Sequence, residues 1–132
     1  MILKFISKRI KTKEDIYSAM TVTEELANEQ EFSIHDVIKM RLATEEACTN
    51  SYEYCRAKGM SYFLIKWSAT PSLIEITVRQ KGKASFPLIE QADVNTGLRG
   101  RGIALMVHLM DKVEIRRRKN CVELYMNKWK GE

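Results

Sequence analysis

The sequence predicts an α+β fold, a two-layer α/β sandwich in which helices cover one face of a mixed, mostly antiparallel sheet. Two patterns predict it. Apolar residues recur at helical spacing in two segments between residues 12 and 57, and they alternate with polar residues, as in strands, over residues 60–79. The length of 132 residues fits one domain spanning 1–132, because a chain of this size builds a single core.

The first part of the chain is expected to form one strand and two helices. Residues 1–9 alternate between apolar residues and lysines, which is typical of an edge strand. A helix is expected over 12–30, where the Thr12 side chain can accept from a first-turn amide. A second helix is expected from Ser33, a good N-cap, to about Ala57, because Gly59 with basic residues before it favours a helix end.

The second part of the chain is expected to form two strand pairs with a loop and a helix between them. Residues 60–69 and 73–79 predict an antiparallel hairpin around a turn at 70–72. Residues 80–101 have no clear period and contain three of the six glycines, with Gly102 directly after them, which predicts a loop that is functional or mobile. An apolar helix is expected over 103–110, and strands over 113–118 and 122–129 close the chain.

Composition excludes several classes of protein. The chain has 22 Lys and Arg against 17 Asp and Glu, a net charge of +5, which suits phosphate ligands or acidic partners. The basic runs at 116–119 and 128–130 are better explained as strand ends than as a nucleic-acid surface, so no direct nucleic-acid contact is expected. Three cysteines without metal-ligand spacing favour a reducing compartment. With no membrane-length apolar run and no signal peptide, we expect a cytoplasmic protein.

Glu46 and Asn50 are the first candidate site residues. They lie four residues apart in the second expected helix, so their side chains share a face, on the side rich in small and apolar residues. A carboxylate there can hold a hydroxyl for proton transfer, and a carboxamide oxygen suits Mg²⁺. The alternative is a pair of polar residues on a helix flank, with partners elsewhere in the fold, and spacing alone favours that alternative.

The glycine-rich segment before the third expected helix is the second candidate. Gly100 and Gly102 precede the helix start at Ile103, where free backbone N–H groups form a typical anion site. Arg99 and Arg101 add positive charge. The alternative is a surface loop that needs small residues for its turns.

Three stretches together resemble one known family. Glu46-Ala-Cys-Thr-Asn50 resembles the Glu-x-x-x-Asn box of the GHKL ATPase superfamily, and residues 79–87 lie where that superfamily has its Asp-x-Gly-x-Gly box. Residues 99–106, with the Leu-Met-Asp-x-Val-Glu sequence that follows at 109–114, resemble the second glycine box of one branch. That branch is the bacterial anti-sigma-factor serine kinases, which are histidine kinase-like ATPases.

The resemblance implies a Bergerat-type sandwich that binds ATP and Mg²⁺. By position, Asn50 would hold the Mg²⁺ ion, Glu46 would be the base for the acceptor hydroxyl, and Gln80 and Gly82 would contact the base end of the nucleotide. Gly100, Gly102 and Ile103 would offer backbone to the phosphates, with Arg99 and Arg101 as extra contacts. Relatives in this branch bind a sigma factor and phosphorylate an anti-anti-sigma antagonist protein, and many are homodimers.

The middle box departs from the family pattern, which leaves enzymatic activity open. Gln80 stands where relatives have an aspartate that accepts from the adenine amino group, and Ala84 replaces a glycine. A glutamine amide can still accept from that amino group while donating to a ring nitrogen. We therefore expect either an ATP-dependent kinase that acts by partner switching, or a non-catalytic relative that binds a protein partner with little or no nucleotide.

Overall fold

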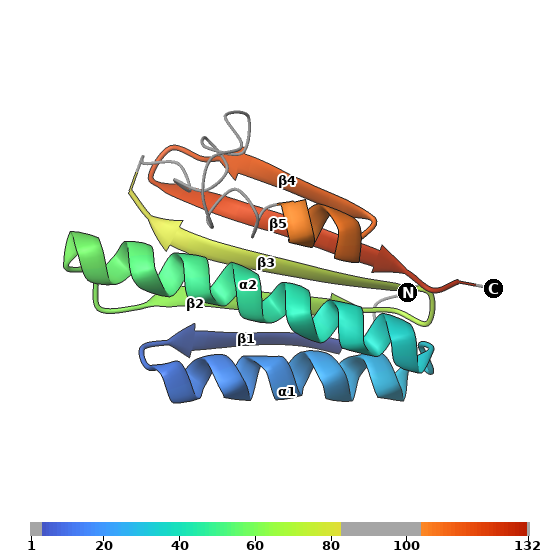
Figure 1. Ribbon diagram of the computed structural model, residues 1–132. Coiled ribbons are helices and arrows are strands. Elements are labelled where there is room, and N and C mark those ends of the chain that lie inside the picture. Colours follow the sequence, from blue (N-terminus) through green and yellow to red (C-terminus); the bar gives the residue numbers. More distant parts are fainter. Residues whose placement is uncertain (1–3, 83–103, 132) are drawn as a thin grey trace.

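A computed structural model describes residues 4–82 and 104–131. In these ranges the backbone forms seven long elements and a short helix over residues 104–109. The seven are β1 (Lys4–Ile10), α1 (Lys13–Glu29), α2 (Ile34–Lys58), β2 (Phe63–Ala69), β3 (Leu73–Lys81), β4 (Lys112–Arg117) and β5 (Cys121–Trp129). Each lies within a few residues of the span that the sequence predicts (Figure 1).

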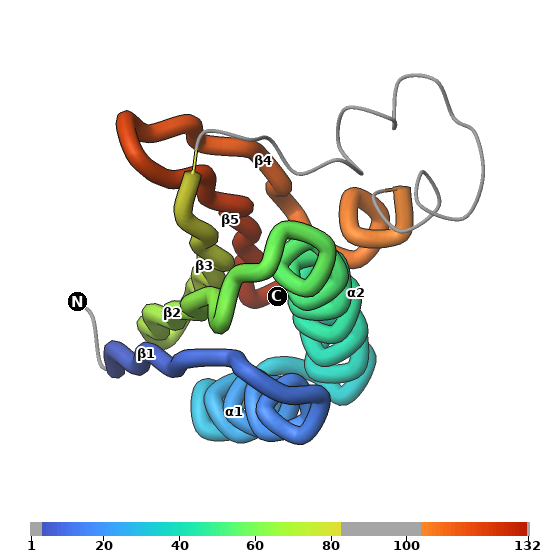
Figure 2. The backbone as a smooth tube through the Cα atoms, turned by 90° about the vertical axis from the view of Figure 1, so that its left-hand side faces the viewer, coloured from blue at the N-terminus to red at the C-terminus, as the bar shows by residue number. Residues whose placement is uncertain are grey.

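The strands form one sheet with the order β1-β2-β3-β5-β4, and each described pairing is antiparallel. The helices lie together on one face of this sheet, as the end-on view in Figure 2 shows. The predicted α+β sandwich, with helices on one face of a mostly antiparallel sheet, is therefore confirmed. Within the described ranges, no helix combines the length and apolarity needed to cross a bilayer.

The helix ends form where capping chemistry predicts them. Thr12 accepts from the Asp15 amide at 3.1 Å and Asp15 accepts from the Thr12 amide at 3.2 Å, which makes a capping box. The Ser33 side chain accepts from the Asp36 amide at 3.2 Å at the start of α2. Gly59 ends α2 with φ of 70°, a left-handed conformation that favours glycine. Each N-cap contributes about 1 kcal/mol.

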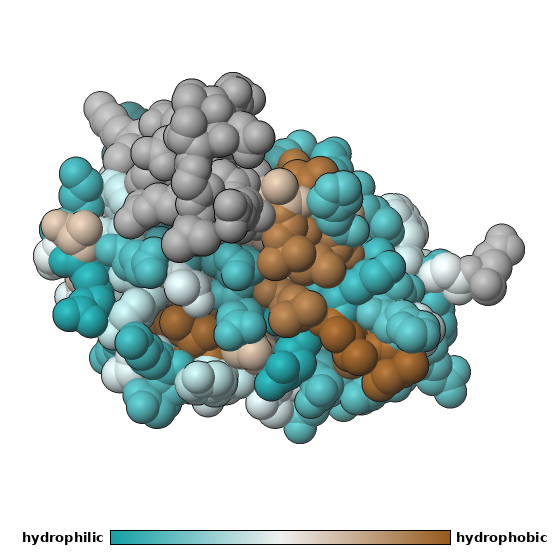
Figure 3. Space-filling model, in the orientation of Figure 1, coloured by the Kyte–Doolittle hydropathy of each residue, from teal (hydrophilic) through white to brown (hydrophobic). Residues whose placement is uncertain are grey.

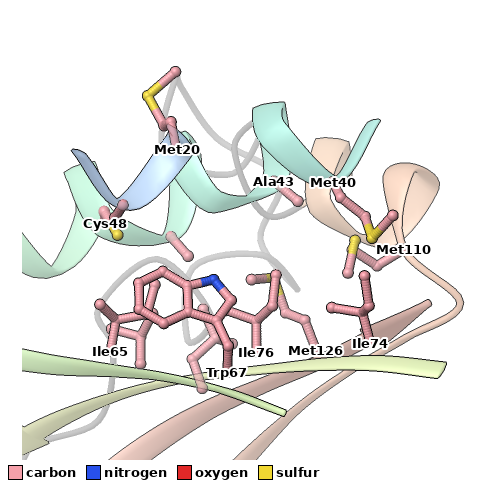
Figure 4. Packing of buried hydrophobic residues seen from close by; sticks show 14 of the residues in the cluster. Met20, Met40, Ala43, Cys48, Ile65, Trp67, Ile74, Ile76, Met110 and Met126 are labelled. Atoms are coloured by element: carbon pink, nitrogen blue, oxygen red, sulfur yellow. The ribbon is translucent and has the colours of Figure 1, made fainter. Parts of the chain in front are cut away.

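The core lies between α1, α2 and the sheet, and Figure 4 shows the Trp67 ring under the helices. The polar atoms buried there have partners. The Trp67 Nε1–H donates to Thr23 Oγ1 at 2.9 Å, and Thr23 Oγ1 is 2.8 Å from Thr44 Oγ1. Thr44 in turn donates to the Met40 carbonyl at 2.9 Å. This chain of hydrogen bonds ties both helices to β2.

Lys128 fastens the short helix at 104–109 to the rest of the layer. This lysine is 8% exposed and lies on the face of β5 that the helices cover. Its ammonium donates to the Leu109 carbonyl at 3.2 Å and pairs with Asp36 at 3.8 Å and Asp111 at 3.7 Å. Because Asp36 belongs to the first turn of α2, the ammonium joins three segments that are distant in sequence.

The apolar pattern of α2 does not coincide with its buried face. Ile34, Ile38 and Leu42 fit the helical period but are 63%, 50% and 36% exposed, whereas Val37, Ala43, Ala47 and Cys48 are buried. Leu105 and Val107 of the short helix are also exposed, at 39% and 55%. Figure 3 shows apolar side chains gathered over the short helix and the first half of α2. We call these five exposed residues the apolar surface.

Candidate functional site

Helix α2 carries both members of the first candidate pair. Glu46 and Asn50 are each half-buried, on a flank of α2 between its buried and exposed faces. Burial raises the pKa of the Glu46 carboxyl, and the neighbouring carboxylates of Glu45 and Glu53 raise it further. A carboxylate with a raised pKa is a stronger base near neutral pH, which suits a role in proton transfer.

The residues around Asn50 include buried polar atoms that the rest of the described chain does not satisfy. Asn50 Nδ2 is buried without a hydrogen-bond partner among the described residues, and so is Ser51 Oγ. Ser51 is fully buried at 0% exposure. Sequence reasoning did not single out Ser51, because a serine in a helix is common and its burial without a partner is visible only in the structure.

Gln80 is a buried polar residue on the apolar face of β3. It alternates along β3 with Ile74, Ile76 and Val78, all buried on the face that the helices cover, and is itself only 1% exposed. Neither Oε1 nor Nε2 has a hydrogen-bond partner among the described residues. An unsatisfied buried polar group costs roughly 1–3 kcal/mol, so a partner that bonds to this amide would stabilise the protein.

The expected loop start at residue 80 was wrong, because β3 continues through Lys81. Gln80 pairs with Val122 of β5 in the interior of the sheet, and this pairing fixes the direction of its side chain. The loop prediction for the remaining residues falls on 83–103 and lies outside the described residues. Because Gln80 belongs to a strand, its side chain is positioned more firmly than it would be in a loop.

Gly82 follows β3 with φ of 101°, a conformation that other residues rarely adopt. A Cβ atom there would lie 3.6 Å from Met60 Cε, an ordinary contact, so backbone angle rather than space requires the glycine. The Gly82 amide donates to the Asn120 carbonyl at 2.9 Å. The observed role of Gly82 is to end the strand, and its contact with a cofactor stays a prediction.

The five residues expected at the phosphate end of the site lie outside the described residues. They are Arg99, Gly100, Arg101, Gly102 and Ile103, and their roles stay predictions. The described part of this region is the helix at 104–109, which begins directly after them.

Both α2 and β3 thus carry buried polar atoms that have no hydrogen-bond partner among the described residues. Helix α2 packs on β3, and both contribute unpartnered buried atoms to the interior between helices and sheet, Asn50 Nδ2 and Ser51 Oγ from α2 and the Gln80 amide from β3. Asn127 Oδ1, which also has no partner among the described residues, belongs to β5 on the opposite face of the sheet.

A groove lies away from Glu46, Asn50 and Gln80, none of which lines it. It has a volume of about 510 Å³ and lies between the start of α1 and the second half of α2. Lys13, Tyr17, Glu45 and Arg56 are among its lining residues, and no residue of the expected site lines it. Among the described residues, no group of three His, Cys, Asp or Glu side chains could hold a metal ion.

The basic run at 116–119 is engaged within the sheet. The Arg116 guanidinium bonds to Glu114 at 2.8 Å and lies 3.8 Å from the centre of the Tyr125 ring, and the Arg118 guanidinium bonds to Glu123 at 3.2 Å. These contacts support the structural interpretation of the run.

Comparison with known proteins identifies the fold family. The family model for the histidine kinase-like ATPase domain matches residues 11–128. A search of curated proteins found no match. Among solved structures, a chain in the crystal structure of the SiaB-SiaC complex from Pseudomonas aeruginosa matches with a TM-score of 0.67 and 10% identity, covering 96% of this chain and 89% of that one. At this identity the structural match shows the fold alone.

The family model covers residues from α1 to β5. The match spans both elements that carry the unpartnered polar atoms, α2 and β3, and an ATPase domain implies a nucleotide site. With the fold, the order of the elements and the family model in accord, the chain belongs to the histidine kinase-like ATPase domain family.

Proposed function

We propose that this protein is a regulatory ATP-binding anti-sigma factor that phosphorylates a serine or threonine of an antagonist protein and acts by partner switching. The observation that carries the proposal is the set of buried, unpartnered polar atoms on α2 and β3 in a chain of the ATPase family. Such atoms cost free energy in the empty protein, and a bound nucleotide would give them partners.

Each site residue has a role in this proposal. The Gln80 amide binds the base, and Asn50 holds Mg²⁺, which would neutralise phosphate charge. The backbone at Gly100, Gly102 and Ile103 would approach the phosphates, with Arg99 and Arg101 as further contacts, and Gly82 would adjoin the base. Positioning and charge neutralisation provide most of the catalysis in phosphoryl transfer, so few reactive side chains are needed.

Glu46 is the proposed base. Its half-buried position and its raised pKa are the observations that support this role, since both strengthen its hold on a proton from the acceptor hydroxyl. The spacing to Asn50 places both side chains on one flank of α2, one turn apart.

The acceptor protein is proposed to dock on the apolar surface. Leu42 lies one turn before Glu46 on α2, so a protein seated on Ile34, Ile38 and Leu42 can bring a hydroxyl to the base. Exposed apolar patches of this kind typically mark protein contacts. The matched SiaB-SiaC structure is itself a complex, which supports a protein partner. We also propose that the protein binds a sigma factor and that it forms a homodimer through β1 and α1.

Two assays on the full chain test this function. Calorimetric titration with ATP, with and without Mg²⁺, measures binding, and transfer of labelled phosphate to a candidate antagonist protein measures activity. Magnesium-dependent binding together with phosphate transfer would support the kinase. Binding of neither nucleotide nor phosphate acceptor by a folded protein would refute it.

A second function is favoured by one observation, the neutral amide at position 80. An amide lacks the charge assistance of the aspartate in relatives, which weakens the hydrogen bond to an adenine amino group. The alternative is therefore a non-catalytic relative that holds a protein partner with little or no nucleotide. A folded chain that binds its partner equally well with and without ATP would favour this alternative.

A further inference from the structure

The Gln80 amide is free to take either of two orientations. Rotation by half a turn about its last bond exchanges Oε1 and Nε2, and neither atom has a hydrogen-bond partner among the described residues that would prefer one orientation. The side chain is also 1% exposed, so water does not compete for it strongly. Strand β3 therefore fixes the position of Gln80, whereas no described residue determines which way its Oε1 acceptor and Nε2 donor point.

Asn127 shows what a fixed amide looks like in the same sheet. The Tyr125 hydroxyl donates to the Glu75 carboxylate at 2.6 Å, so its oxygen is left to accept. The Asn127 Nδ2–H donates to that oxygen at 3.0 Å. The carboxylate at the end of this chain determines which atom of the Asn127 amide points to the tyrosine. Gln80 has no such chain among the described residues.

The two orientations match two classes of purine. Adenine presents an amino donor at position 6 beside an acceptor at N1, which fits an amide whose oxygen accepts and whose NH₂ donates. Hypoxanthine and guanine present a carbonyl acceptor at position 6 beside an N1–H donor, which fits the same amide after rotation. A carboxylate held opposite position 6 accepts from a 6-amino group but repels a 6-oxo group, because both of its oxygens are acceptors.

We infer that the site accepts purine nucleotides with either a 6-amino or a 6-oxo group. The Gln80 amide makes this possible, because one of its two orientations matches each group. The inference rests on the proposed nucleotide site and deepens it by naming the ligand class. Inosine triphosphate is the most direct probe, because it carries the 6-oxo group and N1–H without the extra 2-amino group of guanine.

The test measures dissociation constants for ATP and inosine triphosphate with Mg²⁺ on the full chain and on two variants. The parent is expected to bind the two within about 10-fold of each other, because one amide serves both. Gln80→Asp is expected to weaken inosine triphosphate relative to ATP by roughly 10- to 100-fold, the usual size of a two-bond amide contact. Gln80→Met, which has no donor or acceptor, is expected to weaken both equally and keeps the side chain apolar in case the buried aspartate disturbs folding.

Three results would overturn the inference, and they differ from one another. Parent protein that binds ATP but binds inosine triphosphate more than 100-fold more weakly would show an amide of fixed orientation. An unchanged ratio in Gln80→Asp would remove Gln80 from the base contact. Failure of folded parent protein to bind either nucleotide would overturn the proposed nucleotide site itself, and the inference with it.

Discussion

Replacing Gln80 with methionine is expected to stabilise the empty protein. Methionine has nearly the same length and is apolar, so Gln80→Met removes two buried polar atoms that have no partner among the described residues and keeps most of the packing. Most substitutions of buried residues destabilise, which makes a gain in stability a demanding prediction.

The magnitude follows from the cost of unsatisfied groups. Each buried donor or acceptor without a partner costs roughly 1–3 kcal/mol, and replacement by an apolar group of similar shape removes that cost. Allowing for incomplete fit of the thioether, we expect the free energy of unfolding to rise by about 1–3 kcal/mol. For a domain of this size each kcal/mol shifts Tm by about 3–5 °C.

The assay is urea and thermal unfolding of the nucleotide-free protein, followed by circular dichroism. Thr23→Val is the matched control. Thr23 is also fully buried and faces the same core, but its hydroxyl is bonded to Trp67 and Thr44. Removing it leaves the Trp67 N–H without its acceptor, so this variant is expected to lose about 1–3 kcal/mol.

The two variants should therefore move in opposite directions. If Gln80→Met destabilises the protein as much as Thr23→Val does, Gln80 has good partners in the empty protein. That result would refute the inference that the Gln80 amide lacks partners until a ligand binds, even if nucleotide binds elsewhere.

Three other substitutions test the proposed site and the proposed docking surface. Asn50→Ala should abolish the magnesium dependence of nucleotide binding while leaving Tm within a few degrees; unchanged calorimetric titrations with and without Mg²⁺ would remove Asn50 from the site. Glu46→Gln should keep nucleotide binding and lose phosphate transfer. Because the folded-state pKa of Glu46 is raised, its ionised form destabilises the native state. Glu46→Gln should therefore gain stability relative to the parent as pH rises through that pKa. A difference in unfolding free energy that stays constant over a pH series of urea unfolding would contradict this. Ile38→Asp should weaken acceptor binding at least about 10-fold without changing ATP affinity, whereas Tyr17→Asp, at another exposed position on α1, should leave acceptor binding unchanged. Equal effects of the two in a pull-down with the acceptor would argue against the apolar surface.

Much of the fold could be predicted from the sequence because its signals are local. Thr12, Ser33 and Gly59 end helices through hydrogen bonds and backbone angles within a few residues, and the structure places them as expected. The period-two alternation of β2 and β3 likewise predicts the hairpin, since one face of each strand is buried.

The burial of α2 could not be predicted in the same way. Its apolar residues follow two stripes at helical spacing, and sequence alone does not say which one α1 and the sheet cover. Ile38 and Leu42 fit the pattern as well as Ala43 and Ala47 do, yet the first pair is exposed and the second buried. Tertiary packing, rather than periodicity, decides between them.

The site was predicted in part, and for different reasons at each residue. Glu46 and Asn50 were found through spacing and family resemblance. Gln80 was found through resemblance and placed in a loop, although the alternation of β3 extends to it and puts it on the buried face. Ser51 was missed because a serine in a helix is common, and only its burial without a partner distinguishes it.

The most direct test of the account is calorimetric titration of the folded full chain with ATP and ADP in the presence and absence of Mg²⁺. We expect saturable binding that strengthens with Mg²⁺ and is weakened roughly 10- to 100-fold in Gln80→Met, because the buried amide and Asn50 are the groups that a nucleotide would satisfy. No heat of binding at millimolar nucleotide from protein shown to be folded would contradict it.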